Sequence, residues 1–208
     1  MSEVKLVHAT LGAERLIVKM ARVSNPRNED NWETGPKLIR YLIDHDHWSP
    51  FEMASMCVRI ETERDISAQI LRHRSFSFQE YSGRYSPMDR PELPALRTQA
   101  QKNRQSSVEA LDPEVEKHFT RMSASLISNT YLTYQEMLAA GVARECARRI
   151  LPLCTPTTLY MHGTLRSWMT YIKLRTLPDT QLEHHEIAEA CKAIFVSEFP
   201  TIAEAYFG

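Results

Sequence analysis

Residues 72–85, RHRSFSFQEYSGRY, bring together many side chains that can do chemistry. Arg72 and Arg74 lie two positions apart at the end of an expected helix, so they point in different directions and could serve two anionic groups. Ser82-Gly83-Arg84 can offer successive backbone N–H groups and a guanidinium to one phosphate. Glu80 can accept a hydrogen bond from a sugar hydroxyl or hold an arginine in place. The alternative interpretation is a solvated charged loop with a capping histidine.

The charge composition argues against nucleic acid as a partner, but not against small anionic molecules. The formal net charge is −1, whereas nucleic-acid binding needs a clear basic surplus on one face. Of the 25 basic residues, 18 are Arg and 7 are Lys. Arg suits planar, bidentate recognition of phosphate and carboxylate. The composition therefore predicts no nucleic-acid partner and leaves anionic small molecules open.

Length and residue usage predict one domain over residues 1–208, because 208 residues with 43% hydrophobic content can bury one sizeable core. No apolar run approaches the ~20 residues that span a bilayer, and the N-terminus lacks a signal-peptide pattern, so we expect a cytoplasmic protein without a membrane partner. The four cysteines lie far apart, and His45 and His47 have no evident third ligand. No metal site is therefore predicted.

Hydrophobic periodicity predicts the elements that must position the residues above. Thr34 is the expected N-cap of a helix over 34–46. Thr62 with Asp65 is expected to cap the helix that leads to Arg72. The remaining expectations are a helix over 13–22, a strand over 56–62 with one wet face, a long excursion over 87–112, and helices over 113–141, 142–151, 164–175 and from 179 to before 200.

The 113–141 helix carries apolar residues three or four positions apart. Val115, Phe119, Met122 and Leu126 begin this stripe. Such spacing is typical of core or of a subunit interface, and it gives no reason to expect a cofactor site there.

Arg72-His73-Arg74, followed by seven residues and Ser82, resembles the RHRx7S motif of flavin-dependent thymidylate synthases. The resemblance covers most of the chain. It extends to Ser49-Pro50-Phe51-Glu52, to Gln69, to the segment 144–152 and to the helix 165–175.

The resemblance implies an enzyme of mixed α/β (α+β) class, with a central sheet, flanking helices and homotetrameric assembly. It implies reductive methylation of dUMP to dTMP, with 5,10-methylenetetrahydrofolate as one-carbon donor, FAD as hydride carrier and NADPH as reductant. The residues implied for dUMP are Gln69, Ile70, Leu71, Arg72, Glu80, Tyr81, Ser82, Gly83, Arg84 and Arg148. Those implied for FAD are Ser55, Arg72, His73, Arg74 and Glu80, with Thr164, Leu165, Arg166 and Thr170 from another subunit.

Three residues depart from the commonest pattern of that family. Met53 stands where many members have His, and Thr164 and Thr170 stand where many have Asn. Met can pack on a flavin or folate ring and Thr can form hydrogen bonds, but neither reproduces what His or Asn donates.

Arg175 is the catalytic candidate. Methylating uracil at C5 needs an electron-rich ring, made either by a nucleophile at C6 or by stabilising negative charge on the ring. Cys154 lacks the neighbours of a catalytic cysteine, and no base accompanies Ser82. A guanidinium against N3 and O2 would stabilise the charged ring. As a lone residue, Arg175 would be a cation at a helix C-terminus. His73 fits a flavin or folate contact and a capping or core imidazole equally well.

Two other classes of function stay open. An RNA-binding module could stack bases on Phe76, Phe78 and Tyr81. A catalytically silent flavoprotein is conceivable because Met53 replaces His.

Overall fold

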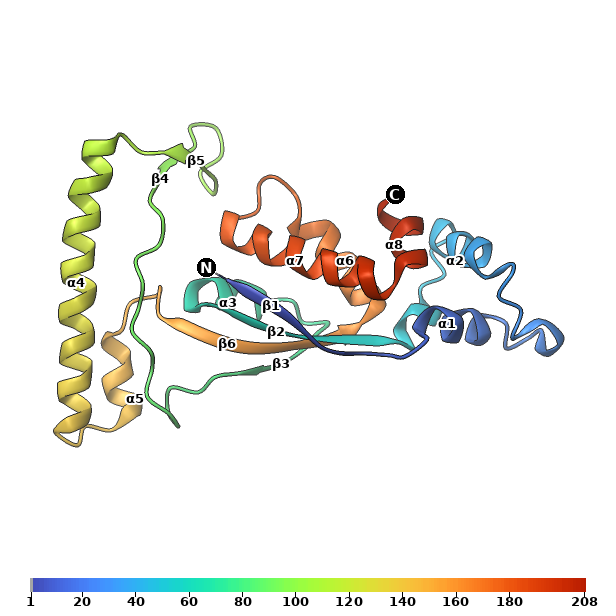
Figure 1. Cartoon of the computed structure of the whole chain (residues 1–208), viewed down its shortest axis with the longest axis horizontal. Coiled ribbons are helices and arrows are strands. Elements are labelled where there is room, and N and C mark those ends of the chain that lie inside the picture. Colours follow the sequence, from blue (N-terminus) through green and yellow to red (C-terminus); the bar gives the residue numbers. More distant parts are fainter. Residues whose placement is uncertain (1) are drawn as a thin grey trace. The chain divides into compact units, whose positions relative to one another are not determined.

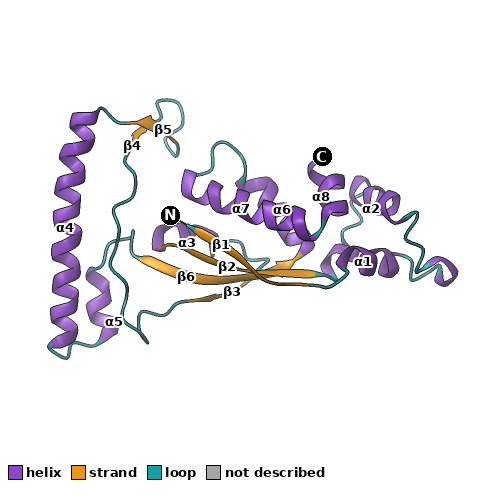
Figure 2. Cartoon of the chain, viewed as in Figure 1, coloured by secondary structure: helices purple, strands orange, loops and turns teal. Residues whose placement is uncertain are grey.

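The computed structural model describes residues 2–208, and all of these except 109 and 110 with their side chains. They form the mixed α/β structure of Figures 1 and 2. A four-stranded sheet has the order β1-β2-β6-β3, with β1 Glu3–Ala9, β2 Ser55–Glu63, β6 Pro156–Thr164 and β3 Ser77–Glu80. A two-stranded sheet pairs β4 (Arg97–Gln99) with β5 (Ser107–Ala110).

The helices account for most of the remaining structure. The α-helices are α1 Ala13–Ala21, α2 Gly35–Asp44, α3 Arg64–Ile70, α4 Pro113–Ala139, α5 Arg144–Ala147, α6 Leu165–Arg175, α7 Leu182–Glu198 and α8 Pro200–Phe207. Short 3-10 helices are η1 Pro26–Asn28, η2 Ser49–Glu52 and η3 Arg148–Ile150. Between residues 2 and 208, no helix combines the length and apolar character needed to cross a membrane.

The described chain divides into two compact units. Unit 1 holds residues 61–71 and 80–159, and unit 2 holds residues 2–60, 72–79 and 160–208. Strands β2, β3 and β6 each run from one unit into the other. One domain over the whole chain therefore stays a prediction.

The core of unit 2 lies between strands and the C-terminal helices. Met56, Val58 and Ile60 alternate along β2 and are fully buried, as a half-buried strand requires. Helix α7 packs on β1 and α6, as Figure 1 shows. Trp168 of α6 is fully buried and donates its indole N–H to the Met56 carbonyl at 2.9 Å. This bond satisfies the polar end of a large apolar side chain and fixes α6 on β2.

Unit 1 is built around the long helix α4. Asp112 caps it, because one carboxylate oxygen accepts from the backbone N–H of Glu114 at 3.0 Å and of Val115 at 3.3 Å. Tyr134 of α4 is buried with Met88, and its hydroxyl accepts from the Met88 N–H at 2.9 Å. The cluster holds the residues after the 82–86 turn against α4.

Several sequence expectations about elements are confirmed and others are wrong. The helices at 13–22, 34–46 and 164–175 and the strand at 56–62 are present as α1, α2, α6 and β2. The expected wet face of β2 is wrong at Cys57, which is buried. The region 142–151 holds only one α-helical turn and a 3-10 turn. The excursion 87–112 contains the β4–β5 hairpin.

Of the two expected caps, Thr34 does take the N-cap position of α2, whereas the cap at Thr62 is wrong. Thr34 makes no cap bond, because its hydroxyl accepts from the buried Arg22 guanidinium at 2.7 Å. Thr62 lies inside β2, and the N-cap position of α3 is Glu63, which makes no side-chain cap bond. Tertiary contacts of β2 and Arg22 thus override the local capping pattern.

Candidate active site

The Ser82-Gly83-Arg84 turn of unit 1 offers several donors to one anion. The Ser82 carbonyl accepts from the N–H of Tyr85 at 3.0 Å and of Ser86 at 3.1 Å, which closes the turn. Within the described chain, the backbone N–H groups of Ser82, Gly83 and Arg84 make no hydrogen bond to protein. Successive N–H groups of this kind can act as donors to one anion, and phosphate binding at this turn stays a prediction.

Gly83 is required by close packing rather than by its backbone angles. A Cβ at this position would lie 2.4 Å from Met88 Sδ and 3.4 Å from Arg148 Cδ. The contact brings Arg148, which is 65 residues after Gly83 in the sequence, beside the turn. Gly83 therefore makes room for the buried Met88 side chain, and Arg148 lies in van der Waals reach of the same position.

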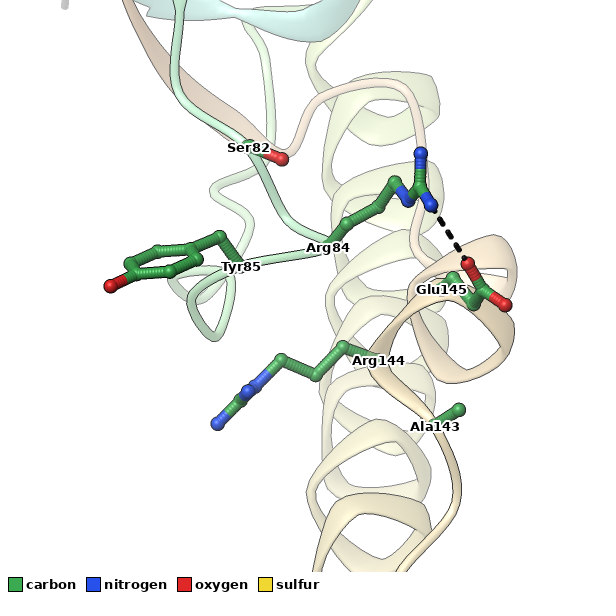
Figure 3. A pocket seen from close by; sticks show the side chains of 6 residues that line it. All are labelled: Ser82, Arg84, Tyr85, Ala143, Arg144 and Glu145. Atoms are coloured by element: carbon green, nitrogen blue, oxygen red, sulfur yellow. Dashed lines mark ion pairs between the residues drawn. The ribbon is translucent and has the colours of Figure 1, made fainter.

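A cavity of about 410 Å3 adjoins this turn, and its lining includes Arg84, Arg144 and Glu145. Figure 3 shows Arg84 reaching toward Glu145, with 3.3 Å between Nη2 and Oε2, while Arg144 extends on the side of Tyr85. Both members of the pair are more than half exposed, so the ion pair is weak and Arg84 can exchange it for another anion.

Glu80 is held by three side chains that all contact one carboxylate oxygen. Its Oε1 accepts from Ser67 Oγ at 2.7 Å and Thr157 Oγ1 at 3.0 Å, and lies 3.5 Å from Arg64 Nη1. Glu80 thus does hold an arginine, but that arginine is Arg64. In the described chain Oε2 has no such contact and can accept from a ligand. The sequence analysis missed these partners, because their spacing from Glu80 follows no local pattern.

The other residues predicted for dUMP belong to unit 1, apart from one. Gln69 and Ile70 end α3, Leu71 follows it, and Ile70 is fully buried, so it can offer only backbone groups. Tyr81 donates its hydroxyl to the Pro87 carbonyl. Arg72, by contrast, belongs to unit 2.

The residues predicted for FAD lie in unit 2, except Glu80, and four of them are the N-cap of α6 or belong to this helix. Thr164 caps this helix, since its hydroxyl accepts from the Ser167 N–H at 3.3 Å. Thr170 donates to the Arg166 carbonyl at 3.1 Å, and buried Leu165 donates its N–H to the Ala54 carbonyl at 2.9 Å. Ser55, at the start of β2, has its backbone bound to the Thr10 hydroxyl. The two threonines thus use their hydroxyls within the chain.

Arg166 links α6 to the SPFE segment. Its guanidinium pairs with Glu52 of η2, and it borders a cavity of about 590 Å3 whose lining also includes Trp48 and Met20. Met53, which follows Glu52, is exposed. The structure therefore brings together the SPFE segment and the helix 165–175, which the sequence analysis named as separate segments.

A hydrogen bond in unit 2 joins the predicted catalytic residue to the RHR segment. Arg175 donates its Nε–H to His73 Nε2 at 2.9 Å. Burial, with the nearby Arg175 charge, lowers the pKa of His73 to about 4. Arg72 and Arg74 are exposed and have no ion pair in the described residues. His73 is thus neutral near pH 7, in contact with Arg175.

The sequence analysis missed a buried pair, Tyr171 and His184, that packs against His73. The Tyr171 ring meets the His73 ring edge-on, with centroids 4.9 Å apart, and the Tyr171 hydroxyl lies 3.2 Å from His184 Nε2. His184 is fully buried, and burial with the charge of Arg175 lowers its pKa to about 3. A histidine in a mixed polar and apolar helix gives no sequence signal of such burial.

Two alternatives lose support from the geometry. Burial raises the pKa of the Cys57, Cys154 and Cys191 thiols, the last to about 12, which disfavours thiolate nucleophiles. Phe76, a proposed stacking platform for RNA bases, is buried edge-on against Trp168 with centroids 4.9 Å apart. In the described residues, no group of three or more His, Cys, Asp or Glu could hold a metal ion.

Comparison with known proteins agrees with the residue pattern. The family model described as "Thymidylate synthase complementing protein" matches residues 5–201. A probable flavin-dependent thymidylate synthase of Paramecium bursaria Chlorella virus 1 is 49% identical, over 93% of this chain and 90% of that protein. A flavin-dependent thymidylate synthase of Synechocystis is 48% identical, over 94% and 90%.

A solved structure matches the whole chain. It is the UMP/dUMP methylase PolB from Streptomyces cacaoi bound with 5-Br dUMP. The TM-score is 0.88 and the sequence identity is 28%, and the match covers 100% of this chain and 95% of that one.

Proposed function

Because the chain belongs to the flavin-dependent thymidylate synthase family, we propose that it methylates dUMP at C5 to give dTMP. The one-carbon donor is 5,10-methylenetetrahydrofolate and the reductant is NADPH. FAD is the cofactor of the family, and when bound it supplies the hydride carrier. A cytoplasmic location remains a prediction from the sequence.

The observation that carries this proposal is the donor-rich turn of unit 1. Three backbone N–H groups suit a doubly charged phosphate, since they have no protein partner among the described residues and lie beside the Arg84 guanidinium and Arg148. Charge-assisted hydrogen bonds from the arginines are the stronger ones. Glu80 keeps Oε2 for a donor such as a sugar hydroxyl. Together these groups fit a nucleoside monophosphate, and we assign them to dUMP.

The residues of unit 2 fit an anionic dinucleotide. The exposed guanidiniums of Arg72 and Arg74 have no ion pair among the described residues, and Arg166 borders a cavity of about 590 Å3. Arginines suit the diphosphate of FAD because of their planar donor geometry. We assign them, together with Ser55, His73 and the start of α6, to the flavin.

Arg175 is assigned to the uracil ring. One of its donors, Nε–H, is used by His73, which leaves the two terminal nitrogens for the N3 and O2 edge. A fixed cation there stabilises the negative charge that develops as C5 becomes nucleophilic. No cysteine is needed for this route.

The enzyme is proposed to act as a homotetramer whose active sites draw residues from several subunits. The support is the apolar stripe of α4, which its own chain leaves open to solvent. Phe119 is 49%, Met122 56% and Leu126 69% exposed. Such a contiguous apolar face on a helix is typical of a protein interface.

The test is dTMP formation by the purified protein with dUMP, 5,10-methylenetetrahydrofolate, NADPH and FAD, each omitted in turn. We expect product only in the complete mixture, and a flavin spectrum that NADPH bleaches. A yellow protein without turnover would identify the silent flavoprotein. A colourless protein that retains RNA in filter binding would identify the RNA-binding module.

A further inference from the structure

We infer that His73 is the positioning residue for Arg175: as a neutral imidazole protonated at Nδ1, it fixes the guanidinium through Nε, and the buried Tyr171–His184 pair holds the imidazole in place. The inference rests on the proposed function only where it concerns turnover. The hydrogen bond itself can be tested independently.

The hydrogen bond determines the charge and tautomer of His73. Arg175 Nε can only donate, because a guanidinium has no acceptor. His73 Nε2, 2.9 Å away, must therefore carry a lone pair. An imidazolium has a proton on both nitrogens and could not accept, so the ring is neutral and its proton is on Nδ1.

The surroundings favour this neutral state. His73 contacts Tyr171 and Arg175, which lie four residues apart and so share one face of α6. The titratable or charged side chains with a hydrogen bond or ring contact to His73 in the described chain are Arg175 and Tyr171 on α6 and His184 on α7, and none is a carboxylate. Desolvation and one fixed cation, with no nearby anion, oppose a second positive charge.

The Tyr171–His184 pair gives the ring a rigid support. Both residues are at most 1% exposed, and His184 Nε2 lies 3.2 Å from the Tyr171 hydroxyl. His184 Nδ1 is buried without a hydrogen-bond partner in the described chain. An unsatisfied buried polar atom costs stability, so the Tyr171 hydroxyl is the contact that offsets part of the cost of burying this imidazole.

The consequence concerns the geometry of Arg175. A guanidinium anchored only by its aliphatic stem can rotate about several bonds, whereas a bond at Nε fixes its plane. The two terminal nitrogens then keep one orientation toward a planar ligand edge. Misplacement of a catalytic group by about 1 Å can cost ~10²-fold in rate.

The first experiment measures the tautomer. Magic-angle-spinning spectra of sedimented holoenzyme labelled with 15N-histidine would be compared with those of His73→Gln to identify the ring signals. At pH 7 we expect His73 to be neutral with a protonated Nδ1 and an acceptor Nε2. Arg175→Lys, which removes the Nε donor, should shift the Nε2 signal. An imidazolium, or a proton on Nε2, would overturn the inference.

The second experiment is a double-mutant cycle, which tests whether His73 acts through Arg175 or independently of it. His73→Met should lower turnover at saturating substrates by ~10–10²-fold, and Arg175→Lys by ~10²–10³-fold. In the Arg175→Lys background, His73→Met should change turnover by less than about twofold, because its partner is already lost. His73→Gln, which keeps an acceptor, should recover most of the loss. His45→Met, an exposed histidine at the C-terminal end of α2, is the matched control.

Losses that multiply in the double variant would overturn the inference, as would failure of Gln to do better than Met. Flavin absorbance is recorded for each variant, and the comparison uses turnover per bound flavin. A parent enzyme that forms no dTMP would overturn the proposed function and the effect on turnover, while the nitrogen spectra would still decide the hydrogen bond.

Discussion

At the scale of single residues, Arg84 combines an anion-binding role with a weak internal ion pair. If it holds the 5′-phosphate with the Ser82-Gly83 amides, Arg84→Ala removes a charge-assisted bond worth ~1.5–3 kcal/mol, or roughly ten- to hundredfold in dUMP affinity. FAD affinity should change little, because its contacts are assigned to other residues. Calorimetric titration of dUMP into parent and variant measures the difference.

Glu145 provides the matched control for Arg84. It pairs with Arg84 at 3.3 Å, and both side chains are more than half exposed. Glu145→Gln removes the competing carboxylate without touching the donors, so dUMP affinity should stay equal or increase. Equal dUMP affinity in Arg84→Ala and parent would refute the phosphate assignment. Lower affinity in Glu145→Gln would show instead that Glu145 positions Arg84.

The buried histidines make stability depend on pH. Burial lowers the folded-state pKa of His73 to about 4 and of His184 to about 3, whereas an unfolded histidine titrates near 6.5. The unfolded state thus binds more protons below pH 6.5. This contribution to stability is fully present above pH 6.5 and is lost as the pH falls toward 4 and then 3.

The pH effect can be isolated with one variant. His184→Gln removes one buried titrating group while keeping a polar side chain, so its unfolding free energy should fall less steeply than the parent's between pH 6.5 and 4. Urea unfolding at several pH values measures both slopes, and subtraction removes the titration of carboxylates common to the two proteins. Parallel slopes would mean that His184 can take up a proton without unfolding.

At the scale of elements, Thr164, which stands where many family members have Asn, caps helix α6. Its hydroxyl caps α6 by accepting from the Ser167 N–H at 3.3 Å. Thr164→Ala should destabilise the protein by ~0.5–2 kcal/mol, whereas Thr164→Asn should keep the cap, since Asn is at least as good an N-cap. Chemical denaturation measures both. Equal stability of the Ala variant and the parent would show that the cap bond contributes nothing measurable.

Elements with a complete hydrophobic period were predictable from the sequence, and those with a broken period were not. Met56, Val58 and Ile60 in β2 and the buried face of α6 carry large apolar side chains at regular spacing. In β6, by contrast, the buried positions include Thr157 and Gly163, which give little hydrophobic signal. The expectations therefore contained α6 and β2 but not β6.

The same distinction applies to the site. The RHRx7S spacing identified the turn at Ser82 and the arginines, because a motif preserves local order. The partners of Glu80, and the Tyr171–His184 pair behind His73, depend on contacts between distant segments. No spacing in a single sequence encodes these contacts, so only the structure could show them.

At the scale of the whole molecule, the exposed face of α4 decides whether the chain acts alone. Leu126 is 69% and Phe119 49% exposed, on a helix whose other side buries Ile127 and Tyr134. Placing charges on the exposed face should leave the fold intact, because these side chains make little contact with their own chain. It should break an interface that buries them, because an unpaired buried charge is costly.

The prediction is that Phe119→Glu with Leu126→Glu converts a tetramer into smaller species and lowers turnover with it, since the resemblance assigns each active site to several subunits. Sedimentation velocity measures the assembly, and circular dichroism checks that the helices remain. Ser128→Glu, at an exposed position elsewhere on α4, adds one glutamate outside the stripe and should leave the tetramer intact. If the double variant stays tetrameric, the stripe is not the interface. If it becomes monomeric with full turnover, each chain holds a complete active site and the shared-site assignment fails.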